Sequence, residues 1–94
     1  MDASEVVITE WAGDLCERWR VDPSELIQAR VDGSVLFGES AIEYGRVVIW
    51  GPRRRDGTHL YIVCGPQPHI INDFRPLKQK PNHAHVPLPI RPVG

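Results

Sequence analysis

The chain has 94 residues and a formal net charge of −1, with 41% hydrophobic and 24% charged residues. This length is that of one small domain, and this composition excludes a wholly disordered chain. No apolar run approaches the ~20 residues of a membrane-spanning helix and no secretory signal is recognisable, so we expect a cytoplasmic protein without a membrane partner. The two cysteines, Cys16 and Cys64, are too few for a disulfide framework and are expected in the core.

The first predicted element is a helix over about residues 9–20. Its apolar residues recur at helical spacing, and they are Leu15 and Trp19 together with Trp11 and Ala12. This spacing predicts one apolar stripe along the helix.

A second helix is predicted to begin at Pro23, a residue that suits the first helical position. Asp22 can cap its first amides, and Glu25 can reach back as in a capping box. The helix is expected to end at Gly33, which can take the left-handed C-terminal conformation.

Residues 34–74 have the composition of β-strands. Two short candidates come first, at residues 35–37 and 41–44. Three runs rich in β-branched residues follow, separated by turns with glycine and proline, and these runs are residues 46–50, 59–64 and 69–74. Connections this short favour antiparallel neighbours.

The predicted fold is therefore α+β, with two N-terminal helices packed on one face of an antiparallel sheet whose central strand is about 58–64. We assign residues 1–77 to this domain and residues 78–94 to an extended, proline-rich tail. In the tail, His83 and His85 lack the further ligands that a metal site needs. Pro89–Pro92 matches the pattern of a PxxP ligand.

Strand alternation sorts the side chains of this sheet into two faces. One face would be apolar and would cover the helices, with Val47, Ile49, Leu60, Ile62, Cys64, Ile70, Asn72 and Phe74. The other face would gather titratable, guanidinium and aromatic side chains, namely Arg46, Trp50, His59, Tyr61, His69, Asp73 and Arg75.

These residue types are the ones that RNA cleavage or RNA binding requires. Proton transfer needs a group such as histidine or tyrosine, charge on the phosphate needs arginine, and an unpaired base needs an aromatic platform. The alternative is an ordinary half-solvated sheet face, on which polar and aromatic residues alternate.

The charges of the chain divide at its middle. Residues 1–45 hold ten acids and three bases, a balance of −7, and residues 46–94 hold eight bases and two acids, a balance of +6. Three of these bases are adjacent in the predicted turn, Arg53, Arg54 and Arg55, and such a run favours a phosphate-bearing partner. Mutual neutralisation of the halves and a solvated charged loop are the alternatives.

Two segments, Glu17–Leu26 and Ile70–Pro76, resemble small RelE/BrnT-type toxin domains in the sequence pattern of the helix pair and of the closing strand. The resemblance covers about residues 10–76. It implies an endoribonuclease that acts on RNA or ribosome-bound mRNA, without metal or other cofactor, and that has a cognate antitoxin as a possible protein partner.

On this hypothesis each candidate residue has a role. His59 or Tyr61 would transfer the proton, with His69 as a second candidate, and Arg46 and Arg75 would stabilise charge on the phosphate. Nucleic-acid binding would fall to Arg53, Arg54, Arg55 and Trp50.

Two other functional classes stay open. Residues 15–26 also resemble a helix-turn-helix, although Arg20 stands where the turn glycine is usual and the second helix would begin with the acids Asp22 and Glu25. A non-enzymatic module, such as a phage or accessory protein that binds or inhibits a protein partner, is the third class.

Overall fold

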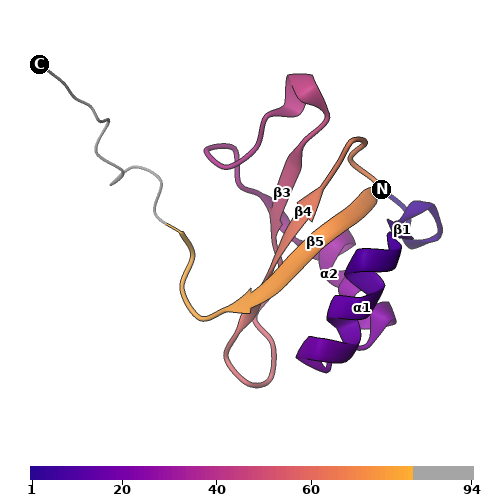
Figure 1. Cartoon of the computed structure of the whole chain (residues 1–94). Helices are drawn as coiled ribbons and strands as arrows, with labels where there is room; N and C mark the ends of the chain where they lie inside the picture. Colours follow the sequence, from indigo (N-terminus) through magenta and orange to yellow (C-terminus); the bar gives the residue numbers. More distant parts are fainter. Residues whose placement is uncertain (82–94) are drawn as a thin grey trace, which may run out of the picture.

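Two helices and a five-stranded sheet make up the described part of the chain, residues 1–81, in a computed structural model (Figure 1). The helices are α1, Glu10–Trp19, and α2, Pro23–Asp32. The strands and short 3₁₀ helices are η1 Ala3–Glu5, β1 Val7–Ile8, β2 Ser34–Val35, η2 Ile42–Tyr44, β3 Val47–Trp50, β4 His59–Cys64 and β5 Ile70–Leu77. The tail features at His83, His85 and Pro89–Pro92 lie outside the described residues. No helix within residues 1–81 is both long and apolar enough to cross a membrane.

Both predicted helices are confirmed, and local capping explains where they begin. The Thr9 side chain accepts a hydrogen bond from the Ala12 amide at 3.2 Å, and the Asp22 carboxylate accepts one from the Ser24 amide at 2.8 Å. The predicted capping role of Glu25 is wrong, because its carboxylate instead accepts hydrogen bonds from Arg54.

The prediction of a left-handed Gly33 is also wrong. The backbone of Gly33 is extended, with φ −77° and ψ 172°, whereas Arg20 takes the left-handed conformation after α1, at φ 55°. Gly33 is required by close packing instead. A Cβ atom there would collide with Ile49 and would lie 2.7 Å from the carbonyl oxygen of Trp50.

The strand order of the sheet is β1-β5-β4-β3-β2, so β4 is central, as predicted. Strands β2 to β5 are antiparallel neighbours, but β1 pairs with β5 in parallel, so the sheet is mixed. A two-residue strand has no alternation from which it could be predicted. Residues 42–44 form η2 rather than a strand, since Ala41 and Arg46 exchange two backbone hydrogen bonds and close the segment between them into a tight loop.

The core lies between the two helices and one face of the sheet. Leu60, Ile62 and Cys64 on β4 are fully buried there, as the alternation predicted. On α1 the residues that face this core are Ala12, Leu15 and Cys16, whereas Trp11 and Trp19 are exposed, so their place in the apolar stripe is wrong. Both cysteines are buried, and burial raises the pKa of each thiol.

On β5 the predicted alternation fails at its start. Cys64 pairs with Ile71 and Val63 with Asp73, so Asn72 is one residue too many for the ladder. This bulge places Ile71 and Phe74 in the core and leaves Asn72 exposed.

Arg30 on α2 fixes the turn between β4 and β5. It is one of the buried residues, and its Nε and Nη2 atoms donate to the carbonyl oxygen of Pro68 at 3.1 and 2.9 Å. The guanidinium therefore satisfies a backbone acceptor and joins α2 to one end of the sheet.

Two glycines allow a matched test of the close packing of Gly33 against β3. Gly33→Ala is expected to lower the free energy of unfolding by about 1–3 kcal/mol, because the added methyl overpacks the contact with β3. Gly13→Ala, in open space within α1, is expected to raise it by about 0.5–1 kcal/mol. Urea unfolding of both variants measures the difference. Equal effects would contradict the close approach at Gly33.

Candidate nucleic-acid interface

The sheet face opposite the helices carries the candidate site. Strand register places Trp50, Tyr61 and Arg75 in one row across β3, β4 and β5. The adjacent row, Val48, Val63 and Asp73, is mostly apolar. The structure thus brings together the predicted Arg46, Trp50, His59, Tyr61, Asp73 and Arg75 on this face or at its edge.

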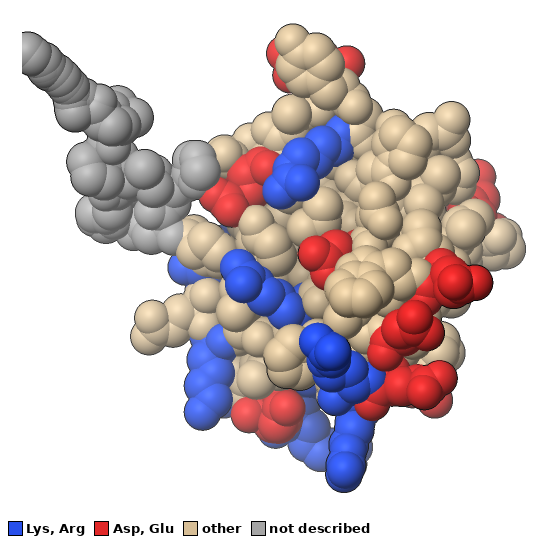
Figure 2. Space-filling view, in the orientation of Figure 1, with Lys and Arg blue, Asp and Glu red and all other residues tan. Residues whose placement is uncertain are grey.

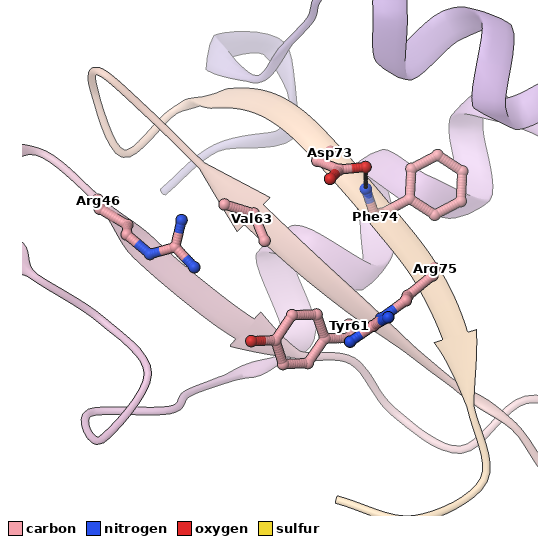
Figure 3. Close-up of a pocket in the computed structure, with 6 residues that line it drawn as sticks. All are labelled: Arg46, Tyr61, Val63, Asp73, Phe74 and Arg75. Atoms are coloured by element: carbon pink, nitrogen blue, oxygen red, sulfur yellow. Dashed lines mark hydrogen bonds between the residues drawn. The ribbon is translucent and has the colours of Figure 1, made fainter. Parts of the chain in front are cut away.

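A pocket of about 320 Å³ opens on this face (Figure 3). Its lining residues are Arg46, Tyr61, Val63, Asp73, Phe74 and Arg75. Arg46 and Arg75 lie on either side of the Tyr61 ring, and Asp73 lies at the rim. The Arg75 guanidinium carbon is 5.6 Å from the centroid of the Tyr61 ring, a cation–π contact.

Glu39, which the sequence did not single out, is bonded to two residues of this site. Tyr61 donates its hydroxyl proton to the Glu39 carboxylate at 2.7 Å, and Arg46 Nε donates to the Glu39 carbonyl oxygen at 3.3 Å. Burial and the bond to Glu39 raise the pKa of Tyr61 to about 12. At neutral pH Tyr61 is therefore a hydrogen-bond donor and not a base.

The two arginines of the pocket form no ion pair with a carboxylate of the described residues. Within residues 1–81 the ion pairs all involve Arg54, so Arg46 and Arg75 have no carboxylate within 4 Å there. The Asp73 carboxylate at the rim accepts a hydrogen bond from the Phe74 amide at 2.9 Å. An anion would consequently bind between the guanidinium groups and away from Asp73.

His59 lies next to the pocket but does not line it. Its Nδ1 atom is 2.8 Å from the carbonyl oxygen of Gly51, and its ring is stacked on Trp50 at 4.7 Å between centroids. In the neutral ring this contact puts the proton on Nδ1 and leaves Nε2 as an acceptor. His69 precedes β5 beyond the other end of β4, so the structure does not bring the two histidines together.

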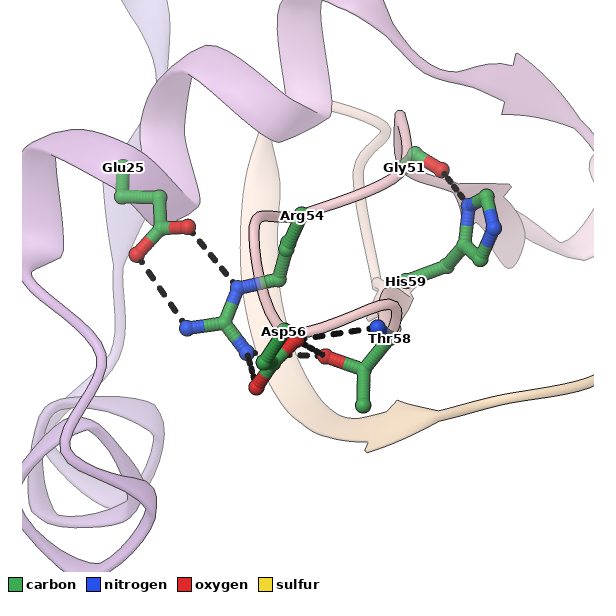
Figure 4. Close-up of polar contacts among 6 residues, drawn as sticks. All are labelled: Glu25, Gly51, Arg54, Asp56, Thr58 and His59. Atoms are coloured by element: carbon green, nitrogen blue, oxygen red, sulfur yellow. Dashed lines mark hydrogen bonds and ion pairs between the residues drawn. The ribbon is translucent and has the colours of Figure 1, made fainter.

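The three arginines of the β3–β4 hairpin differ in their surroundings. Arg54 is bonded to Glu25 at 2.8 Å and to Thr58 at 3.0 Å, and it pairs with Asp56 at 3.5 Å (Figure 4). Glu25 raises the pKa of Arg54 further, chiefly through this hydrogen bond. Arg54 thus joins the hairpin to α2, whereas Arg53 and Arg55 are exposed.

The surface charges are unevenly distributed, although single acidic groups also lie among the basic ones in Figure 2. Acidic side chains gather over α1 on the right of Figure 2, and basic side chains are spread over the centre, the left and the lower end. Because His59 pairs with Leu77, Lys78 and Lys80 follow at the same end of the sheet as the arginine hairpin. Within residues 1–81 no three His, Cys, Asp or Glu side chains are grouped to hold a metal ion.

No family model, no curated protein and no solved structure matches this chain.

The raised pKa of Tyr61 can be measured directly. Tyr44→Phe leaves Tyr61 as the single tyrosine, and its phenolate absorbance is expected to rise around pH 12 instead of 10.0. The pKa of Tyr61 is higher in the folded protein than in the unfolded chain. The stability that the neutral Tyr61 hydroxyl contributes is therefore present below pH 10 and is lost as the pH rises from 10 to 12. A midpoint near 10 would contradict the buried bond to Glu39.

Proposed function

We propose that this protein binds RNA through the sheet face opposite α1 and α2, with a backbone phosphate held between Arg46 and Arg75. The observation that carries the proposal is the pair of guanidinium groups on either side of the Tyr61 ring, neither of which has a carboxylate partner within residues 1–81. Guanidinium groups match the geometry of phosphate oxygens and are held weakly by water.

A polymer fits this surface better than a small anion. The pocket is open, and further basic residues lie at one end of the sheet, namely Arg53, Arg55, Lys78 and Lys80. A chain of phosphates could contact the pocket and this end together, which a single small anion could not.

The aromatic residues favour RNA over duplex DNA. Trp50 lies half-buried on the sheet, and sequence-specific RNA recognition uses such aromatic side chains as platforms for splayed bases. Tyr61 is only 8% exposed and lies under Arg75, so it does not offer a base an open ring face. The helix-turn-helix alternative is less well supported, because the surface over α1 is acidic and Glu25, in the first turn of α2, is bonded to Arg54.

Three substitutions in the pocket test phosphate binding. Arg46→Gln and Arg75→Gln are each expected to weaken binding of a labelled RNA 12-mer about fivefold to tenfold at low salt, as each loses a charged contact. Asp73→Asn, which keeps an oxygen for the Phe74 amide, is expected to strengthen binding because it removes a repelling charge. Fluorescence polarisation over a series of salt concentrations measures the affinity of each variant. The slope of log affinity against log salt concentration is expected to be lower by about 0.7 for each lost phosphate contact.

Arg18→Gln is the matched control, since Arg18 is an exposed arginine of α1 and the substitution removes the same charge. Equal loss in Arg18→Gln and in the pocket variants would show that only net charge matters. Weaker binding by Asp73→Asn would contradict an anion in this pocket.

A toxin-like endoribonuclease is the second candidate, and the geometry of His59 favours it. With its Nδ1 proton donated to Gly51, Nε2 can accept the proton of an RNA 2′-hydroxyl. The 2′-oxygen would then bond to the adjacent phosphorus, the bond to the 5′-oxygen would break, and that oxygen would take a proton from water. Arg75, which lies beside Tyr61 two residues along from His59, would hold the phosphate oxygens during this exchange. Arg46 lies at the opposite end of β4 from His59, so its predicted catalytic role is not supported by the strand register.

Cleavage is tested by incubating the protein with RNA in EDTA, with and without ribosomes. His59→Ala is expected to lower the rate by about 10²–10⁴, and an RNA with a 2′-deoxy cleavage site is expected to be resistant. His69→Ala is the control and should keep the rate. Cleavage of the 2′-deoxy RNA would reject the mechanism. An inactive wild type that still binds RNA would reject cleavage and keep RNA binding as the function.

A further inference from the structure

The segment between β2 and β3 exposes two aromatic rings that the core does not use. The side chains of Phe37 and Tyr44 are 74% and 82% exposed, and neither belongs to the hydrophobic core. Large exposed apolar groups of this kind mark binding surfaces when they lie together. The proposed RNA site borders this segment, because Glu39 and Arg46 belong to both.

This segment is held to the sheet by several hydrogen bonds. The Ser40 hydroxyl donates to the Leu36 carbonyl at 2.8 Å and accepts from the Val48 amide at 2.9 Å. Tyr61 binds the Glu39 carboxylate, and Ala41 and Arg46 exchange backbone bonds of 3.0 and 3.1 Å. The two rings are therefore carried on an anchored backbone, which lowers the entropy lost when a ligand binds them.

Both rings are close in sequence to a contact of Arg46. Tyr44 precedes Arg46 by two residues, and Phe37 precedes Glu39, whose carbonyl oxygen Arg46 binds, also by two. Two residues span at most about 7 Å. The backbone that carries each ring is therefore close to Arg46 or to Glu39, to which Arg46 is bonded.

The charges of this segment favour bases over phosphates. Glu43 in η2 is acidic and would repel a phosphate backbone from this part of the segment, whereas the pocket beside it offers Arg46 and Arg75. The Glu39 carboxylate is bound by the Tyr61 hydroxyl at the edge of that pocket. Electrostatics would thus direct the backbone to the pocket and the bases to the rings.

We propose that Phe37 and Tyr44 stack on unpaired bases and make the site selective for single-stranded RNA. The inference rests on the proposed RNA binding and adds its substrate class. Ring faces can stack only on bases whose own faces are free, which an intact duplex does not offer, and such stacking tolerates any base sequence.

The test compares three labelled ligands of equal length: a single-stranded RNA 12-mer, the same RNA annealed to its complement, and a ribose-phosphate 12-mer without bases. Wild type is expected to prefer the single strand at least tenfold over both others. Phe37→Ala and Tyr44→Ala are each expected to weaken single-strand binding about tenfold, in line with the loss of one stacked base. Their binding to the base-free ligand should not change.

Two controls separate stacking from loss of structure. Tyr44→Phe keeps the ring and should bind as wild type does, and Ile42→Ala removes an exposed aliphatic residue of η2 and should also have no effect. Irradiation at 254 nm followed by mass spectrometry should map crosslinks to Phe37 or Tyr44.

The outcomes distinguish this inference from the proposed function. If the double variant Phe37→Ala/Tyr44→Ala keeps the single-strand preference while Arg46→Gln and Arg75→Gln lose binding, stacking is rejected and RNA binding stands. Equal affinity of wild type for duplex and single strand rejects it as well. If wild type binds none of the three ligands, both proposals fail, and the exposed rings are then a surface for a protein partner.

Discussion

The packing of α1 and α2 against the inward side chains of β4 decides which residues of the sheet reach solvent. Leu60, Ile62 and Cys64 are fully buried in this contact, so the residues between them must point to the opposite face. Tyr61 is the central member of that face, where it donates to Glu39 and lies under Arg75. The candidate site is thus a direct consequence of the core, because one alternation places both.

The acidic residues of the first half of the sequence and the basic residues of the second half have different surroundings in the fold. Five of the ten acidic residues of the first half lie on α1 and α2, and one of them, Glu25, binds Arg54 and with it the β3–β4 hairpin. The other basic residues of the described part of the second half, residues 46–81, are exposed, including Arg46 and Arg75. Mutual neutralisation and a basic surface are therefore both present, and Arg54 belongs to the former.

Much of this fold follows from local sequence, and the exceptions have physical reasons. Asp22 and Pro23 begin α2 through contacts with their own neighbours, and the β-branched run of β3 needs no partner to be recognised. The bulge at Asn72 depends on how β5 meets β4, so alternation within β5 alone misplaced Ile71. Glu39 could not be found at all, because only the fold of residues 36–46 brings it to Tyr61.

We propose that the open sheet face, and not the helices, binds RNA. Amide spectra of the ¹⁵N-labelled full chain, titrated with a single-stranded RNA 12-mer at low salt, test it most directly. We expect the largest shifts at Arg46, Tyr61 and Arg75 and in residues 36–46, with little change in α1 and α2. Shifts concentrated on the two helices, or no shifts at all, would contradict it.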